Sequence, residues 1–89
     1  MGKVDCIRLE SYDLWFHSSD HLPPHFHCAK TSEWEIRVYF LDCTHKHGLA
    51  YDLKWGRKPR SPVKRHLNKS VIENRAELLR EWEQKVIVY

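Results

Sequence analysis

Alternating hydrophobic and polar positions are the strongest pattern in this chain, and they predict β-strands. The clearest run covers residues 33–40, where the apolar members are Trp34, Ile36, Val38 and Phe40. A period of two also runs through residues 12–17 and 49–55. Such alternation places one set of side chains against a core and the other in water, as in an antiparallel sheet. Residues 4–10, where apolar and β-branched residues stand among charges, predict a further strand.

The last third of the chain changes to a helical period. Its apolar residues recur three or four positions apart, and they are Val63, Leu67, Val71, Leu78, Leu79, Trp82 and Val86. Ser61 followed by Pro62 is typical of a helix N-cap and first helical position. We expect one long helix over about residues 62–85, because neither Gly nor Pro interrupts it. A capping-box pattern at residues 70–73 offers the alternative of a break near residues 68–70.

These elements predict an α+β fold in a single domain, residues 1–89. We expect a small antiparallel, meander-like sheet of about four to five strands packed against one long carboxy-terminal α-helix. Residues 49–55 follow the strand at 33–40 after a short glycine-ended loop, which predicts a hairpin. Residues 87–89 are β-prone and predict a short terminal strand. The expected core consists of Trp34, Ile36, Val38, Phe40, Leu53, Leu67, Leu78, Leu79 and Trp82.

Composition narrows the class of protein. Apolar residues make up 42% of the chain and charged residues 30%, which favours a globular fold with a solvated surface over disorder. No run of about 20 apolar residues is present, so a membrane span and a membrane partner are not expected. The three cysteines (Cys6, Cys28 and Cys43) are an odd number, and no apolar signal region opens the chain. Both features predict a reducing, cytoplasmic location.

Residues 23–27, Pro-Pro-His-Phe-His, form the most distinctive motif. The prolines restrict the backbone to an extended conformation. If the chain continues as a strand, His25 and His27 share one face, and Phe26 and Cys28 share the other. The two imidazoles are candidates for metal ligands, for an acid–base pair, or for an ordinary polar surface, and the sequence does not choose among these roles.

A second histidine pair, His45 and His47, follows in a predicted surface loop. Imidazole is a ligand that zinc prefers, so His25, His27, His45 and His47 are weak candidates for a site holding zinc or another transition metal. Neither pair has the spacing of an established zinc motif. The primary expectation is therefore no cofactor.

A basic segment follows the second histidine pair. Its candidate binding residues are Lys54, Trp55, Arg57, Lys58, Arg60, Lys64, Arg65 and Lys69, and no acidic residue lies between Leu53 and Ile72. Such a segment is suited to the phosphates of a nucleic acid, to an acidic protein partner, or simply to water. Trp55 adds a ring that can stack on an unpaired base.

Several of these residues together resemble a known family. The Pro-Pro-His-Phe-His motif, the aromatic strand at 14–17 and a closing helix with Leu78-Leu79 followed by Trp82 resemble the family labelled domain of unknown function 4160. The resemblance covers about residues 7–85 and implies a small bacterial cytoplasmic α+β protein, with His25 and His27 as the matching site candidates. It also implies a toxin–antitoxin-like or mobile-element context. Residues 42–62 depart from the family pattern because they are longer and more basic.

Three classes of function follow from these features. The leading hypothesis is a non-enzymatic binding module for a protein or nucleic acid, acting through the basic segment. The alternative is a small hydrolase, either metal-assisted or a metal-independent ribonuclease. In that ribonuclease, His25 or His27 transfers protons and Arg57 or Lys58 stabilises phosphate charge. The third is a self-associating homodimer, because an open sheet leaves edges that can pair.

Overall fold

The computed structural model describes residues 2–88, which form a two-layer α+β fold. In chain order the elements are β1 (Gly2–Lys3), β2 (Asp13–Phe16), β3 (Ser19–Asp20), β4 (Phe26–Lys30), β5 (Trp34–Val38), β6 (Tyr51–Gly56), α1 (Ser61–Glu73), α2 (Arg75–Lys85) and β7 (Ile87–Val88). Five strands form an antiparallel sheet in the order β1-β2-β4-β5-β6. Strands β3 and β7 form a separate parallel pair.

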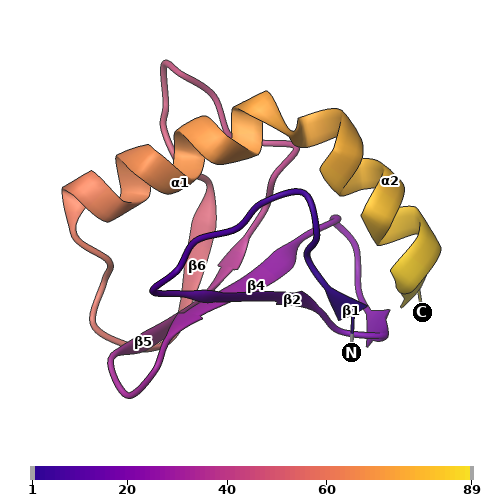
Figure 1. The fold of residues 1–89 in the computed structure, drawn as a ribbon, viewed down its shortest axis with the longest axis horizontal. Coiled ribbons are helices and arrows are strands. Elements are labelled where there is room, and N and C mark those ends of the chain that lie inside the picture. Colours follow the sequence, from indigo (N-terminus) through magenta and orange to yellow (C-terminus); the bar gives the residue numbers. More distant parts are fainter. Residues whose placement is uncertain (1, 89) are drawn as a thin grey trace.

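Both helices lie on the same side of the five-stranded sheet (Figure 1). The sheet residues facing them are buried, and they include Leu14, Phe16, Phe26, Cys28, Trp34, Ile36 and Val38; Phe40, just beyond β5, is buried as well. The helices contribute Leu67, Val71, Leu78 and Trp82 to the same core. The alternation predicted for residues 12–17 and 33–40 is therefore confirmed. Side chains at the intervening positions form the outer face of the sheet, which carries the site described below.

The prediction of one long helix is wrong, because the helical region breaks at Asn74. Helix α1 ends at Glu73 and α2 begins at Arg75, with φ −119° and ψ 16° at the residue between them. The Asn74 side chain donates to the carbonyl oxygen of Ser70 at 2.8 Å and so competes with the helical backbone. Arg75 then donates to the carbonyl oxygens of Phe40 and Cys43, which ties this corner to the segment that follows β5.

The start of the helical region also differs from expectation. Arg60 is the N-cap residue, Ser61 is already helical, and no side chain caps the first turn. The capping-box pattern at residues 70–73 lies inside α1 and starts no helix. The Ser61 cap was thus misplaced by one residue, and the break lies at residue 74 instead of 68–70.

The strand predicted for residues 4–10 is absent, because this segment is irregular and only β1 precedes β2. Val4 and Ile7 are buried in the core, so its apolar residues follow a spacing of three instead of two. The backbone amides of Asp5 and Cys6 donate to the carboxylate of Glu81 on α2, at 2.7 and 2.9 Å. The Glu81 side chain therefore accepts the backbone hydrogen bonds that the carbonyl groups of a neighbouring strand would accept in a β-sheet.

Strand β6 carries a bulge that changes the faces of its residues. Glu35 pairs with Trp55 and Ile36 pairs with Leu53, so Lys54 is the extra residue. Trp55 thereby joins the face of Glu35, whose Oε1 lies 3.4 Å from the indole Nε1. Leu53 is 38% exposed and Trp55 46% exposed, so the assignment of Leu53 to the core was wrong. Leu79 is only partly buried.

The carboxy-terminal strand is confirmed for Ile87–Val88, while Tyr89 lies outside the described residues. All three cysteines are free thiols. No helix in the described part of the chain has the length and apolar character needed to cross a bilayer.

Candidate functional site

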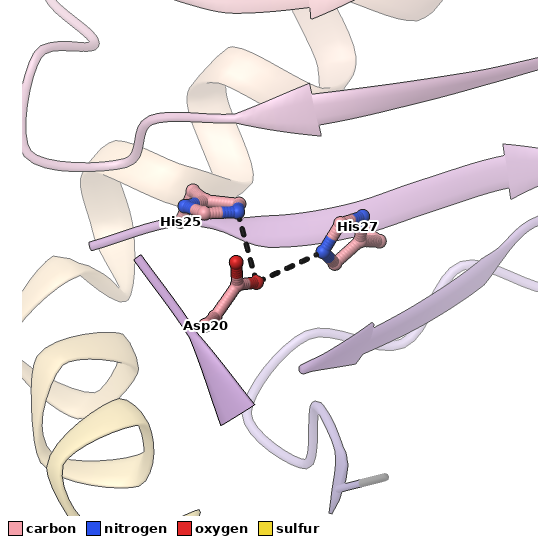
Figure 2. A group of neighbouring side chains, drawn as sticks. All are labelled: Asp20, His25 and His27. Carbon is pink, nitrogen blue, oxygen red and sulfur yellow. Dashed lines mark hydrogen bonds and ion pairs between the residues drawn. The ribbon is translucent and has the colours of Figure 1, made fainter. Parts of the chain in front are cut away.

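Three polar side chains converge on the outer face of the sheet: Asp20, His25 and His27 (Figure 2). The Oδ2 atom of Asp20 lies 3.0 Å from Nε2 of His25 and 3.2 Å from Nε2 of His27. One ligand atom from each of the three residues lies within 4.8 Å of the others. We call this group the triad.

Two separate parts of the fold hold the triad in place. His27 lies on β4 and His25 directly precedes it, so both imidazoles share one face of the sheet, as predicted. Asp20 lies on β3, which is paired with β7 through Asp20 and Val88. Its Oδ1 accepts a hydrogen bond from the backbone N–H of His21 at 2.9 Å. The strand pairing and this hydrogen bond therefore fix the orientation of the Asp20 carboxylate toward the two imidazoles.

The two imidazoles are almost completely buried, with exposed fractions of 5% for His25 and 2% for His27. Trp15 stacks on His27 with ring centroids 5.5 Å apart, and the His17 ring lies 4.1 Å from the His27 ring. The Tyr39 ring lies beside the His25 ring, with ring centroids 5.4 Å apart. The Asp20 side chain is 15% exposed. Polar groups this deeply buried need partners, because losing water without compensation is costly.

The hydrogen bonds of His25 identify which of its nitrogens carries a proton. Nδ1 lies 2.9 Å from the carbonyl oxygen of Pro23, which can only accept, so Nδ1–H is the donor. In the neutral ring Nε2 is then a lone pair that faces the Asp20 carboxylate at 3.0 Å. This contact has no hydrogen-bond geometry, and Nε2 has no hydrogen-bond partner within residues 2–88. Two acceptors this close repel each other unless a proton or a cation joins them.

Burial also determines the charge of His27. Burial lowers the pKa of His27 to about 4; the nearby His17 and His25 add to this, while the Asp20 carboxylate opposes it. His27 is therefore neutral at pH 7 and offers one lone pair. For Asp20, burial acts to raise the pKa, but hydrogen bonds from the His21 amide and His27, with the charges of both imidazoles, lower it overall. The triad thus presents a carboxylate beside a neutral imidazole.

The donor set and its spacing suit a metal ion. Ligand atoms about 2.1 Å from a zinc-like ion lie about 3.0 Å apart at neighbouring octahedral positions and about 3.4 Å apart in a tetrahedron. Two of the three separations in the triad, the N–O distances of 3.0 and 3.2 Å, are of this size. Two histidines and one carboxylate also form a recognised ligand set for ferrous iron. Asp20 escaped the sequence reasoning, because an acid in a turn before the Pro-Pro motif carries no spacing signal of its own.

The second histidine pair does not join the triad. His45 and His47 are exposed in the loop between β5 and β6, which is closed by a bridge between Thr44 and Gly48. The four-histidine metal site is therefore not assembled, and only His25 and His27 belong to the candidate centre.

The basic segment is divided between two surfaces. Lys54 pairs with Glu35 at 3.0 Å on the outer face of the sheet, beside Trp55. Lys64, Arg65 and Lys69 instead line a hollow shared with the histidine loop, lying between that loop and α1. The remaining predicted residues are exposed and lie between Lys54 and Lys64 in the sequence; they are Arg57, Lys58 and Arg60.

Comparison of the chain with protein-family models, with curated proteins and with solved structures finds no match. The resemblance to the domain of unknown function 4160 family therefore stays a prediction. So do the bacterial, cytoplasmic and toxin–antitoxin expectations attached to it. The geometry of the triad and of the basic surface is therefore the evidence that bears on function.

Proposed function

We propose that the protein binds a divalent transition-metal ion through Asp20, His25 and His27, and that this ion serves a hydrolytic reaction. The observation that carries the proposal is the approach of the His25 Nε2 lone pair to Asp20 Oδ2 at 3.0 Å. A cation bound between these atoms replaces a repulsion with two attractions. Its effect is large because the site is buried and the effective dielectric is low.

His25 has the kind of outer hydrogen bond that metal-binding histidines have, and His27 has a carboxylate near its outer nitrogen but no hydrogen bond to it. His25 donates from Nδ1 to the Pro23 carbonyl, and Nδ1 of His27 lies 3.7 Å from Glu35 Oε2. Burial acts to raise the pKa of Glu35, but Lys54 and Trp55 lower it overall, so Glu35 is a carboxylate that attracts the Nδ1 proton. His25 Nε2 then turns a lone pair toward Asp20, whereas His27 Nε2 is hydrogen-bonded to Asp20 at 3.2 Å, so metal binding would move the His27 proton to Nδ1. Such outer contacts fix the tautomer and orientation of metal ligands.

Three protein ligands favour a catalytic over a purely structural centre. Structural zinc sites have four protein ligands, whereas catalytic sites have three and leave a position for water or substrate. When bound in such a site, zinc lowers the pKa of water and polarises a carbonyl or phosphoryl group. Among the three ligands, Asp20 is the most exposed and marks the side open to solvent.

Space for a substrate lies beside the residues that surround His27, although none of the three triad residues lines it. A cavity of about 930 Å³ lies beside β2 and is lined by Trp15, His17 and Glu35, all neighbours of His27. Its volume is within the range of small-molecule sites. Residues 7–10 of the irregular amino-terminal segment form part of its wall.

Two other interpretations of the triad make different predictions. In an ordinary polar cluster, a proton on His25 Nε2 pairs with Asp20 and no metal binds. In a metal-independent ribonuclease, His25 or His27 must reach the RNA directly. Exposed fractions of 5% and 2% leave those rings little access to a polymer, which favours the metal proposal.

Metal analysis of protein purified without an affinity tag tests the proposal. We expect close to one equivalent of zinc or iron, its loss on chelation, and a higher Tm when Zn²⁺ is returned. Asp20→Asn keeps the shape of the side chain but removes its charge, and it should weaken Zn²⁺ binding at least tenfold. His21→Gln is the matched control, because His21 is exposed in the same segment and should bind Zn²⁺ as the wild type does.

One result of the metal analysis would refute the proposed metal site. Metal-free protein whose Tm does not respond to Zn²⁺, Fe²⁺, Co²⁺ or Mn²⁺ would leave the polar cluster as the explanation. The hydrolytic part is tested with nitrophenyl esters and phosphodiesters, where activity should require the metal and be lost in Asp20→Asn. Cleavage of RNA that persists in chelator would instead support the metal-independent ribonuclease.

The other two sequence-based hypotheses stay predictions. A homodimer is supported by β6, a six-residue edge strand whose residues are mostly exposed. The binding module is supported by the basic surface that α1 shares with the loop that carries His45 and His47.

A further inference from the structure

A hollow of about 620 Å³ lies between the loop that joins β5 to β6 and helix α1. Figure 1 shows this loop rising beside α1. The charged and polar lining residues include His45, His47, Lys64, Arg65, Asn68 and Lys69, and no acidic residue is among the lining residues of the described chain. Tertiary structure thus brings the second histidine pair together with part of the basic segment.

The walls of this hollow are fixed relative to each other. The buried Asn68 side chain donates from Nδ2 to the Thr44 carbonyl oxygen at 3.0 Å, which ties α1 to the loop. Thr44 and Gly48 exchange backbone hydrogen bonds at 3.2 and 2.8 Å, and the His47 N–H donates to Thr44 Oγ1 at 2.9 Å. The loop therefore needs little ordering when a ligand binds, which favours affinity.

The cations around the hollow lack acidic partners. Within residues 2–88, Lys64, Arg65 and Lys69 form no ion pair, whereas Lys30 and Arg80 pair with acids three residues away. The Lys64 ammonium instead lies 5.8 Å from the centre of the Tyr51 ring. The first turn of α1, which opens on the hollow at Ser61, contains no acidic residue and no side-chain cap. Uncompensated positive charge with free amides suits an anion.

We propose that this hollow binds the phosphate groups of single-stranded nucleic acid. The positive charge continues beyond the hollow through the exposed residues Arg57, Lys58 and Arg60, so it extends past the size of one phosphate. The hollow also has an aromatic ring in its wall, that of Tyr51, whereas the exposed Trp55 lies on the outer face of the sheet. A basic surface with an aromatic ring is how proteins bind unpaired bases with little sequence preference. The hollow and the triad share no residue, so a chelator would leave this surface unchanged.

Fluorescence anisotropy with a labelled uridine 12-mer tests the proposal over a range of KCl concentrations. The double variant Arg65→Gln with Lys69→Gln should weaken binding at least tenfold. It should also reduce the slope of log Kd against log[KCl] by about 1.4, since each lost phosphate contact on a single strand contributes about 0.7. The control, Lys30→Gln with Arg80→Gln, makes the same charge change on exposed residues outside the hollow and should bind nearly as the wild type does.

A second pair of substitutions approaches the hollow from its other wall. His45→Gln with His47→Gln alters only exposed side chains of the loop and should also weaken binding. Thermal melting of each variant separates lost binding from lost folding.

Four results would overturn the proposal. They are no binding of the 12-mer at 20 mM KCl, equal losses in the basic double variant and its control, equal affinity for a duplex, and equal affinity for uridine monophosphate. Displacement of the 12-mer by polyglutamate at equal charge would assign the surface to an acidic protein instead. Retained binding in chelator with these controls satisfied would support the proposal even if the metal centre fails its own test.

Discussion

Replacing Glu81 with Gln tests how the irregular amino-terminal segment is held to the fold. Glu81 accepts backbone hydrogen bonds from Asp5 at 2.7 Å and Cys6 at 2.9 Å, and the Lys85 ammonium lies 2.9 Å from Oε1. The neighbouring Val4 and Ile7 depend on this attachment for their place in the core. Gln keeps the size of the side chain and one acceptor oxygen, but removes the charge.

The magnitude follows from the pKa of Glu81. Burial acts to raise this pKa, but hydrogen bonds from Cys6, the Asp5 amide and Lys85 lower it from 4.5 to about 2. At 1.36 kcal/mol per pKa unit, that difference stabilises the folded protein by about 3 kcal/mol. The side chain is only 13% exposed, so solvent screening is small. Since Gln keeps part of the hydrogen bonding, we expect Glu81→Gln to cost about 2 kcal/mol at pH 7.

The sign of the pH dependence is also fixed. The folded pKa lies below the unfolded one, so the contribution is complete above about pH 5 and is lost as the pH falls toward 2. Urea unfolding followed by tryptophan fluorescence at pH 7 and pH 3 measures it. The gap between wild type and Glu81→Gln should fall by more than half at pH 3. The control Glu77→Gln alters a 52% exposed carboxylate and should cost under about 0.5 kcal/mol.

If Glu81→Gln is no less stable than Glu77→Gln at pH 7, the hydrogen bonds from the Asp5 and Cys6 amides to Glu81 contribute nothing to stability. If the gap in stability between Glu81→Gln and wild type is the same at pH 3 as at pH 7, the effect does not come from the charge of Glu81.

Three further predictions concern single residues. Gly56→Ala should cost at least about 3 kcal/mol in urea unfolding, because φ is +88° and a Cβ would meet a backbone carbonyl oxygen at 2.1 Å. Gly48→Ala, at φ +79° with open space around it, should cost about 1 kcal/mol, and equal costs would refute the steric argument. Arg75→Ala removes two donors to backbone carbonyls and should cost about 2–3 kcal/mol, against under about 0.5 kcal/mol for the exposed Arg80→Ala. Burial raises the pKa of Cys28 to about 12, so its thiol should react with a disulfide reagent only at the rate of unfolding; rapid labelling of the native protein would contradict this.

Local pattern alone determined much of this protein. Strict alternation at residues 33–40 predicted which side chains of β5 are buried, because successive strand residues point to opposite faces. The same rule placed His25 and His27 on one face, and the helical period identified Leu67, Leu78 and Trp82 as core residues. These conclusions depend on neighbours within a few residues, which the sequence displays directly.

Tertiary structure decided what depends on distant partners. Asp20 joins the triad only because β3 pairs with β7, at the other end of the chain. Helix α1 ends where Asn74 bonds back to Ser70 and Arg75 reaches carbonyls in the segment that follows β5. Likewise, the Glu81 carboxylate accepts the backbone hydrogen bonds of residues 5 and 6, which a neighbouring strand would accept in the strand that the sequence predicts there. Except for the local Asn74–Ser70 hydrogen bond, these contacts span more of the chain than any local period. The physical reason is therefore long-range packing and hydrogen bonding that residue order does not record.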